Sequence, residues 1–179
     1  LKQRGLVHLA GNPVGCVFEQ QGLVEADVTS NVLSWCSEAT VLSFRANSLT
    51  RLPDGVRGMS LLEQLDMSEN AMGGEEDPIG AASHLPRLQF INVSRCSWTR
   101  WPHSLTDTGT RVTSESCGSS CHWPRLNHID VSANNLSTVD ARLVKKFQGA
   151  DENTASTKDF PCTVQLEGNG IERIEWFSF

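Results

Sequence analysis

The chain has 179 residues, 39% of them hydrophobic and 20% charged, which is enough for one sizeable core and short for two domains. A formal net charge of −6 argues against a nucleic-acid partner, because neutralising a phosphate backbone requires a concentrated surface of Lys and Arg. No apolar run approaches the roughly 18 residues that cross a bilayer, so we expect no membrane insertion.

A spacing of apolar residues around an asparagine recurs along the chain. In LLEQLDMSENAM, apolar residues stand eight, five and three positions before Asn70 and again two positions after it. Such alternation is typical of a half-buried strand that ends in a turn. The complete sets, in chain order, are Ala39, Leu42, Phe44, Asn47, Leu49; Leu62, Leu65, Met67, Asn70, Met72; Leu88, Ile91, Val93, Cys96, Trp98; Leu126, Ile129, Val131, Asn134, Leu136; and Pro161, Val164, Leu166, Asn169, Ile171.

The N-terminal residues hold a weaker copy of this spacing. It consists of Val7, Leu9, Asn12 and Val14, with Arg4 where the first apolar residue is expected. The intervals between the six Asn or Cys positions are 35, 23, 26, 38 and 35 residues. Because such repeats usually have roughly 20 to 29 residues, we expect extra structure in the three longer intervals.

The pattern L-x-x-L-x-L-x-x-N/C-x-L resembles the leucine-rich repeat superfamily over nearly the whole chain. The resemblance implies one domain over residues 1–179, a curved α/β solenoid with about five or six short parallel strands and with helices or loops on the convex side. It also implies that the Asn side chain bonds backbone groups of a buried turn, which would be costly to leave unpaired. The repeat positions are Asn12, Asn47, Asn70, Cys96, Asn134 and Asn169.

Two of the long intervals carry helix signals. Between 12 and 47, an apolar stripe at helical spacing follows Asp27, a residue suited to the N-cap. Its members are Val28, Val32, Leu33 and Cys36. Between 134 and 169, a capping box at 137–140 and a C-cap at Gly149 predict a helix over roughly 138–148, followed by a polar loop over 150–158.

The remaining long interval and the C-terminus have other compositions. Residues 103–121 are rich in Ser, Thr and Gly, and we interpret them as a surface insertion loop. Residues 171–179 are strongly apolar, which predicts a cap over the last coil, since the ends of a solenoid expose their core. Continuation into further chain is the alternative.

One cluster has the spacing of metal ligands. Cys117 and Cys121, with His103 and His122 nearby in sequence, could supply the four S/N ligands of zinc. A disulfide or two free thiols explain the same cysteines, so we assign no metal site and no cofactor. The sequence also lacks G-x-S-x-G, H-E-x-x-H and Walker motifs, and we expect no enzyme activity.

The solvent side of the expected sheet is the main candidate for function. Residues six, four and two positions before each repeat asparagine point away from the core, since strand side chains alternate. Aromatic and Arg side chains dominate interface hot spots, so Phe90, Arg45 and His128 are the expected anchors. The alternative is an ordinary solvated face. The expected partner-binding residues are Arg45, Gln64, Asp66, Phe90, Asn92, His128, Asp130, Gln165 and Glu167.

These features predict a non-catalytic module that binds another protein. Within the superfamily, four segments resemble the repeat domain of the tubulin-specific chaperone called cofactor E. This resemblance implies a cytoplasmic protein that binds tubulin. The segments are NPVGC at 12–16, LEQLDMSENAM at 62–72, NVSRCSWTRW at 92–101 and PRLNHIDVSANNLS at 124–137.

An extracellular adhesion or receptor ectodomain is the alternative. The sequons that start at Asn92 and Asn135 would then carry N-glycans, and Cys16–Cys36 or Cys117–Cys121 would form disulfides. Six spread cysteines equally suit reduced thiols packed in a core. Counting reactive thiols on the unfolded chain separates the two compartments.

Overall fold

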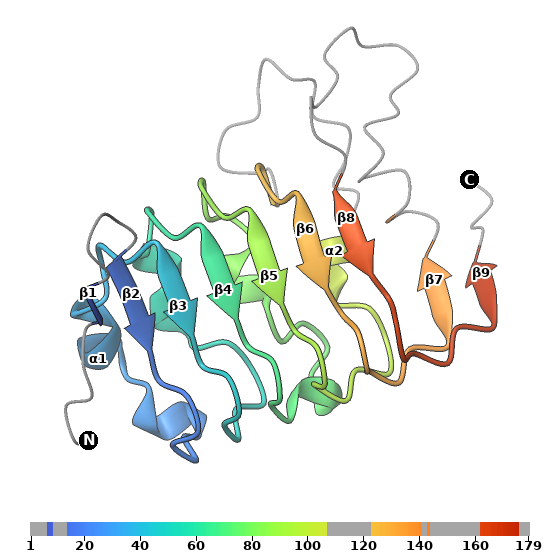
Figure 1. Ribbon diagram of the computed structural model, residues 1–179, viewed down its shortest axis with the longest axis horizontal. Coiled ribbons are helices and arrows are strands. Elements are labelled where there is room, and N and C mark those ends of the chain that lie inside the picture. Colours follow the sequence, from blue (N-terminus) through green and yellow to red (C-terminus); the bar gives the residue numbers. More distant parts are fainter. Residues whose placement is uncertain (1–6, 9–13, 107–122, 141–142, 144–161, 176–179) are drawn as a thin grey trace, which may run out of the picture.

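Seven short strands form one sheet that runs the length of the molecule (Figure 1). The computed structural model describes residues 7–8, 14–106, 123–140, 143 and 162–175. The strands are adjacent in the order β1, β2, β3, β4, β5, β6, β8, and those from β2 onward pair in parallel. They comprise β1 (Val7–His8), β2 (Val14–Val17), β3 (Val41–Ser43), β4 (Gln64–Asp66), β5 (Phe90–Asn92), β6 (His128–Asp130) and β8 (Thr163–Gln165).

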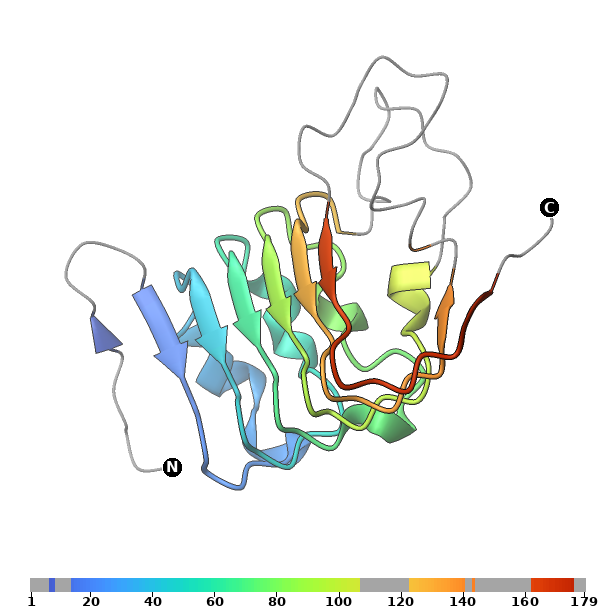
Figure 2. The same ribbon diagram turned by 45° about the vertical axis from the view of Figure 1, so that its right-hand side comes forward.

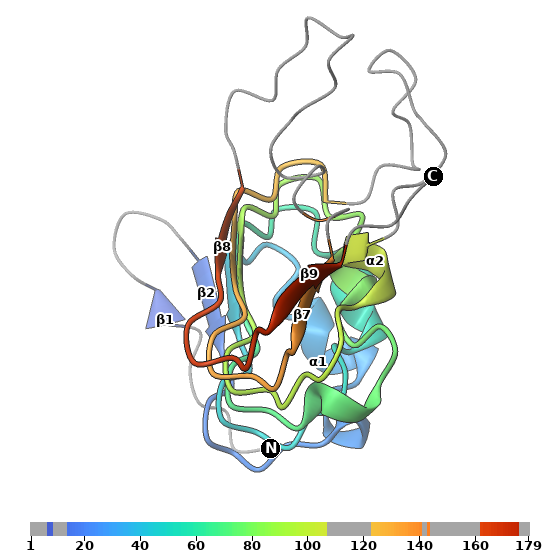
Figure 3. The same cartoon turned by 90° about the vertical axis from the view of Figure 1, so that its right-hand side faces the viewer.

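Short helices lie together on the other side of this sheet (Figures 2 and 3). None of those in the described residues exceeds five residues, because coils of 23 to 26 residues leave little room between one strand and the next. They are η1 (Glu25–Asp27), α1 (Ser30–Ser34), η2 (Asp54–Gly58), η3 (Met72–Gly74), η4 (Gly80–Ala82) and α2 (His103–Thr106). The predicted fold class, a curved α/β leucine-rich repeat solenoid with six parallel strands, is confirmed.

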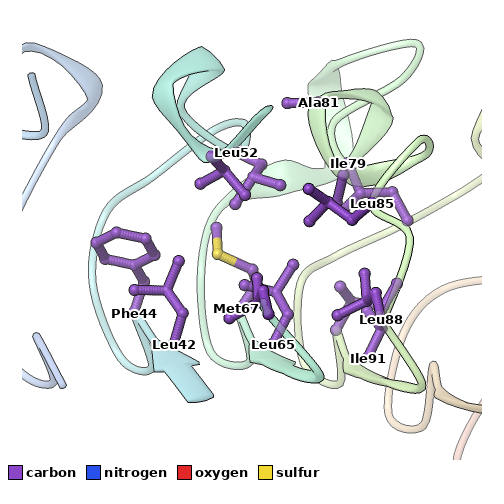
Figure 4. Packing of buried hydrophobic residues seen from close by; sticks show 14 of the residues in the cluster. Leu42, Phe44, Leu52, Leu65, Met67, Ile79, Ala81, Leu85, Leu88 and Ile91 are labelled. Carbon is purple, nitrogen blue, oxygen red and sulfur yellow. The ribbon is translucent and has the colours of Figure 1, made fainter. Parts of the chain in front are cut away.

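The core is a set of apolar columns that run from coil to coil. Leu42, Leu65, Ile91 and Ile129 pair across neighbouring strands and are all 0% exposed. Figure 4 shows Leu42, Leu65 and Ile91 of this column, with Phe44 and Met67 beside them and the residues of the helical side above. Each of these side chains is removed from water only because a neighbouring coil covers it, so adjacent coils stabilise one another.

Asn70 bridges two coils through its side-chain amide. Its Oδ1 accepts the N–H of Leu49 at 3.0 Å, and its Nδ2 donates to the carbonyls of Phe44 and Met67, both at 2.9 Å. The side chain is 4% exposed, and it satisfies backbone groups that water does not reach. The asparagine therefore closes its own turn and holds the preceding coil at once.

The other described repeat positions act in the same way. Asn134 accepts the N–H groups of Cys96 and Trp98, both at 2.9 Å, while Asn47 and Asn169 likewise bond the coil before them. The Cys96 thiol donates to the Met67 carbonyl, with Sγ at 3.2 Å from the oxygen. Burial raises the pKa of this thiol to about 12, so it stays a neutral donor.

The residue before each of these positions has a left-handed backbone. The φ angles are between 52° and 70° at the residues Ala46, Glu69, Arg95, Ala133 and Gly168. Only one of the five is glycine, the residue that adopts this region freely. The turn geometry is thus imposed by the stacked coils and leaves little trace in the sequence.

The N-terminal repeat was predicted wrongly. β1 pairs with β2 in antiparallel fashion, so His8 is not part of the parallel face, and Asn12 itself lies outside the described residues. β2 pairs Cys16 with Leu42, which places Gln21 at the position that Asn47 has in the next coil. Gln21 lies 26 residues before Asn47, an ordinary coil length, and the expected 35-residue interval disappears.

The first helix was predicted in the right region but with the wrong start. α1 begins after Thr29, whereas Asp27 ends η1 and its Oδ2 accepts the N–H of Val24. Leu33 is 2% exposed, and Cys36, which follows the helix, forms a disulfide with Cys16 of β2. The bridge ties the helical side of this coil to its strand.

The prediction of a helix from 138 was wrong at its start. Residues Thr138–Asp140 form strand β7, which pairs in parallel with β9 (Arg173–Glu175) in a second, two-stranded sheet. Leu143 is buried, and the rest of 138–148 lies outside the described residues, as does the loop over 150–158. Residues 171–175 thus contribute a strand on the last coil, and a cap by 176–179 stays a prediction.

The segment 103–121, predicted as a surface insertion loop, begins with a short buried helix. Residues 103–106 form α2, in which Ser104, Leu105 and Thr106 are buried, so these residues are not a surface loop. Trp123 is buried at the far end of the interval, and its Nε1 donates to the Ser104 carbonyl at 2.9 Å. Residues 107–122, including the Cys117 and Cys121 pair, lie outside the described residues.

Candidate functional site

The solvent side of the sheet brings most of the predicted binding residues together. The register aligns Gln64, Phe90 and His128 in one row across β4, β5 and β6. A second row, parallel to the first, consists of Asp66, Asn92, Asp130 and Gln165. Neighbouring members of a row are about 4.8 Å apart, the spacing of paired strands. The sequence therefore predicted this grouping correctly, whereas Ser43 and Ser68, which were expected on the same face, are buried.

Phe90 and His128 form an aromatic pair at the centre of this face. Their ring centroids are 4.8 Å apart, and their planes are inclined by only 12°. Both side chains are half-buried, so one ring face or edge of each remains open to a partner. Stacked rings of this kind present a rigid, flat surface whose position is set by the two strands.

The three central polar residues of the second row have a structural role as well. One oxygen of each, Oδ1 of Asp66, Asn92 and Asp130, accepts the N–H of the residue two positions further on, at 2.9 to 3.0 Å. These bonds end the strands and fix the side chains. Among the residues that the structure describes, no donor bonds the second carboxylate oxygen of Asp66 or Asp130.

Arg45 is less available than the sequence suggested. Its Nη2 lies 2.9 Å from Oε1 of Glu69, and Arg95 approaches the same oxygen at 3.8 Å. The hydrogen bond to Glu69 raises the pKa of the Arg45 guanidinium. Glu69 and Arg95 were missed because they occupy the left-handed position before the repeat residue, which the strand alternation does not reach.

The part of the face that surrounds the aromatic pair carries negative charge and no Lys or Arg. Its eleven outward positions on β4, β5, β6, β8 and their extensions include three acidic residues. We call this area the acidic-aromatic patch. It consists of Gln64, Asp66, Phe90, Asn92, Ser94, His128, Asp130, Ser132, Thr163, Gln165 and Glu167.

Other aromatic residues divide into buried and exposed ones. Trp98, Trp101 and Trp123 are buried, so Trp101 and Trp123 do not form a second contact surface. Trp35 lies directly after α1 and is 68% exposed, which the sequence gave no reason to expect. It lies outside the sheet and apart from the acidic-aromatic patch.

Neither metal chemistry nor a membrane span has support in the described parts of the chain. No group of three His, Cys, Asp or Glu side chains there could hold a metal ion. No helix there combines the length and the apolar character that crossing a bilayer requires. What the face offers chemically is a fixed aromatic surface flanked by negative charge.

Two solved structures are similar to this chain. The leucine-rich repeat domain of APL1B has 21% identity and a TM-score of 0.49, covering 83% of this chain and 34% of that one. A leucine-rich repeat protein from Bacteroides eggerthii has 20% identity and a TM-score of 0.47, covering 77% of this chain and 20% of that one. The chain thus spans about a third and a fifth of the two structures. No family model matches the sequence, and no curated protein matches it.

The stacked coils and their asparagine bridges define the class as a leucine-rich repeat protein by fold. Stacked repeats of this kind form an extended concave surface. What such a surface binds depends on its exposed side chains and not on the scaffold.

Proposed function

We propose that this chain is a non-catalytic protein-binding module whose acidic-aromatic patch receives an arginine-bearing segment of a partner protein. The observation that carries the proposal is the Phe90–His128 pair, which lies next to the row that holds the carboxylates of Asp66 and Asp130, in a patch without Lys or Arg. Arg45 lies beside the patch and is already paired with Glu69.

An arginine side chain fits this arrangement in charge and in shape. A guanidinium group over the face of Phe90 gains a cation–π contact when it lies within about 6 Å of the ring centroid. Asp66 and Asp130 flank Asn92, two strand spacings or about 10 Å apart, so one of them is within reach of such a group. Planar bidentate pairing with a carboxylate favours arginine over lysine.

We further propose that the protein is extracellular, on the evidence of its disulfide. The Cys16–Cys36 disulfide supports the extracellular alternative, since structural disulfides persist mainly in oxidising compartments. Asn135 is exposed, whereas Asn92 is half-buried and uses its Oδ1 for the N–H of Ser94, so Asn135 is the better site for a glycan. Tubulin and a cytoplasmic location rest on the sequence resemblance alone. Six reactive thiols on the unfolded native protein would contradict the extracellular proposal.

Affinity capture with matched variants tests the binding face. Immobilised wild-type protein and Trp35→Ala should retain the same partner, because Trp35 is exposed but lies outside the patch. Phe90→Ala and Asp130→Asn should lose it. Free arginine should elute the partner, and citrulline, its neutral analogue, should not.

Two outcomes contradict the proposal. Equal retention by wild type and Phe90→Ala would show that another surface binds the partner. Equal elution by arginine and citrulline would leave the protein-binding role in place and remove the cationic recognition. Circular dichroism of each variant checks that the fold is retained.

A further inference from the structure

A polar cavity of about 330 Å³ lies on the helical side, away from the acidic-aromatic patch. Its walls come from three successive coils, through η2, η4 and the start of α2. Leu52 and Ala81 of this region are labelled in Figure 4, where they cover the apolar core from the helical side. The lining of the cavity itself is almost wholly polar.

The rim carries two arginines, two histidines and two aspartates. Arg51, Arg57 and His103 line the cavity from two of the three coils. No acceptor for the Arg51 guanidinium is present in the part of the chain that the structure describes, and Arg57 meets Asp54 only in an exposed contact of 3.4 Å. An exposed pair of this kind contributes little and is easily exchanged for another acceptor.

Each of the two aspartates of the rim has a partner within the cavity wall. Asp77 Oδ1 accepts the hydroxyl of Ser104 at 2.7 Å. Its other oxygen lies over Gly80, where an added Cβ would approach Oδ2 to 2.5 Å, so the glycine permits this position. Asp54 faces Arg57. Both carboxylates keep their negative charge, but neither accepts a hydrogen bond from Arg51 or His103 within the described residues, so the donors of these two side chains remain available for a ligand.

The walls are fixed to one another before any ligand binds. The N–H of Leu52 donates to the Pro78 carbonyl at 2.7 Å, which joins the first wall to the second. Trp123 donates its backbone N–H to the Ser83 carbonyl and its Nε1 to that of Ser104, which joins the second wall to α2. A site whose donors are already held in place loses less entropy on binding.

We infer that this cavity binds an oxoanion, a phosphate or a sulfate group, through Arg51, Arg57 and His103. Arginine and histidine side chains donate charge-assisted hydrogen bonds to such groups, and arginine can do so through two N–H groups at once. This inference is independent of the protein-binding role, because the two sites lie on opposite sides of the sheet.

Titration of the ¹⁵N-labelled full chain with inorganic phosphate, and separately with sulfate, tests this assignment. Saturable shifts should appear at residues 51–57, 77–84 and 103–104 with one or both anions, and sodium chloride at equal ionic strength should not reproduce them. Arg51→Ala should weaken binding at least about tenfold, as the loss of a hydrogen bond to a charged group does.

Arg95→Ala is the matched control. Arg95 is also an exposed arginine, but it lies at the edge of the sheet face beside Glu69. Its removal should leave the phosphate affinity unchanged. Lack of saturation with both anions, or equal weakening by Arg51→Ala and Arg95→Ala, would overturn the inference, since it would indicate general charge screening. His103→Gln tests the third donor without removing an arginine.

Discussion

The two faces of the same strands differ in how uniform their side chains are. On the core side, every strand from β3 to β6 presents one branched aliphatic residue at the same register position, fully buried. On the solvent side, the adjacent positions hold an amide, a phenyl ring and an imidazole in Gln64, Phe90 and His128. The core face repeats because every coil meets the same neighbour, whereas the solvent face varies because no neighbouring coil packs against it.

The largest expected effect of a single change is at a repeat asparagine. Asn70→Ala should lower the free energy of unfolding by about 3–5 kcal/mol, because three buried backbone groups lose their partner. Asn92→Ala, which changes an asparagine on the solvent face, should cost about 1 kcal/mol or less. Urea unfolding of both variants measures the difference, and equal losses would contradict the distinction between the faces.

The second prediction compares the effect on stability of removing a core side chain and of removing its solvent-facing neighbour on the same strand. Leu65→Ala should destabilise the protein by about 3 kcal/mol, since it leaves a cavity between two coils. Gln64→Ala, one position earlier and exposed, should change stability by no more than about 0.5 kcal/mol. Thermal unfolding resolves these values, and a loss above about 1 kcal/mol for Gln64→Ala would break the comparison.

The N-terminal coil has a covalent link where the inner coils have an asparagine bridge. Replacing both Cys16 and Cys36 with Ser should lower stability by about 3 kcal/mol, as expected for a bridge across 20 residues. Reduction of the wild type should give the same loss. An unchanged unfolding midpoint after reduction would show that the bridge is not needed to close this end.

Cys96 gives the stability of the core a dependence on pH. Its thiol stays protonated in the folded state up to about pH 12, whereas the unfolded chain loses the proton above its ordinary pKa of 9.0. Between these values the folded state binds more protons, so stability should fall as pH rises, by at most about 1.4 kcal/mol per pH unit. Below pH 9 the thiol contributes no slope.

Unfolding curves of wild type and Cys96→Ala from about pH 8 to pH 11 measure this effect by difference. The stability of the wild type should fall more steeply above pH 9. Parallel pH profiles of the two proteins would argue against a buried, neutral thiol. Iodoacetamide should likewise label Cys96 in urea and leave it unlabelled in the folded protein at neutral pH.

Phe90, at the centre of the acidic-aromatic patch, should contribute less to stability than the core residues. Phe90→Ala should cost only about 1 kcal/mol, the size of a half-exposed aromatic contact, because the lost stack with His128 supports no buried backbone group. The same variant should lose the partner in affinity capture. A stability loss as large as that of Leu65→Ala would assign Phe90 to the core instead.

Regular spacing allowed the fold to be predicted from the sequence. Asn47, Asn70, Cys96, Asn134 and Asn169 were identified correctly, because each must bond two coils and few side chains can do so. The first coil departs from this rule. It has no earlier parallel coil to bond, so Gln21 stands where an asparagine was expected, and the sequence pattern selected Asn12 instead.

Features that depend on contacts between distant residues were not predictable. Thr138–Asp140 reads as a helix start, but its pairing with Arg173–Glu175 makes it a strand. Alternation placed Arg45, Asp66 and Asp130 on the right face, yet it could not show that an ion pair or a backbone N–H engages them. The polar cavity on the helical side was missed because its two arginines and His103 come from separate coils that are far apart in the sequence.

Hydrogen exchange of individual amides tests the asparagine bridges most directly. Within the described residues, the N–H groups of Cys96 and Trp98 bond only the side chain of Asn134, 2.9 Å away in the next coil. If these bridges hold the solenoid together, both amides should exchange as slowly as the amide of Val93, which bonds the carbonyl of Asp130, through global unfolding. Exchange of Cys96 and Trp98 within minutes, while Val93 stays protected, would show that the coils stack without them.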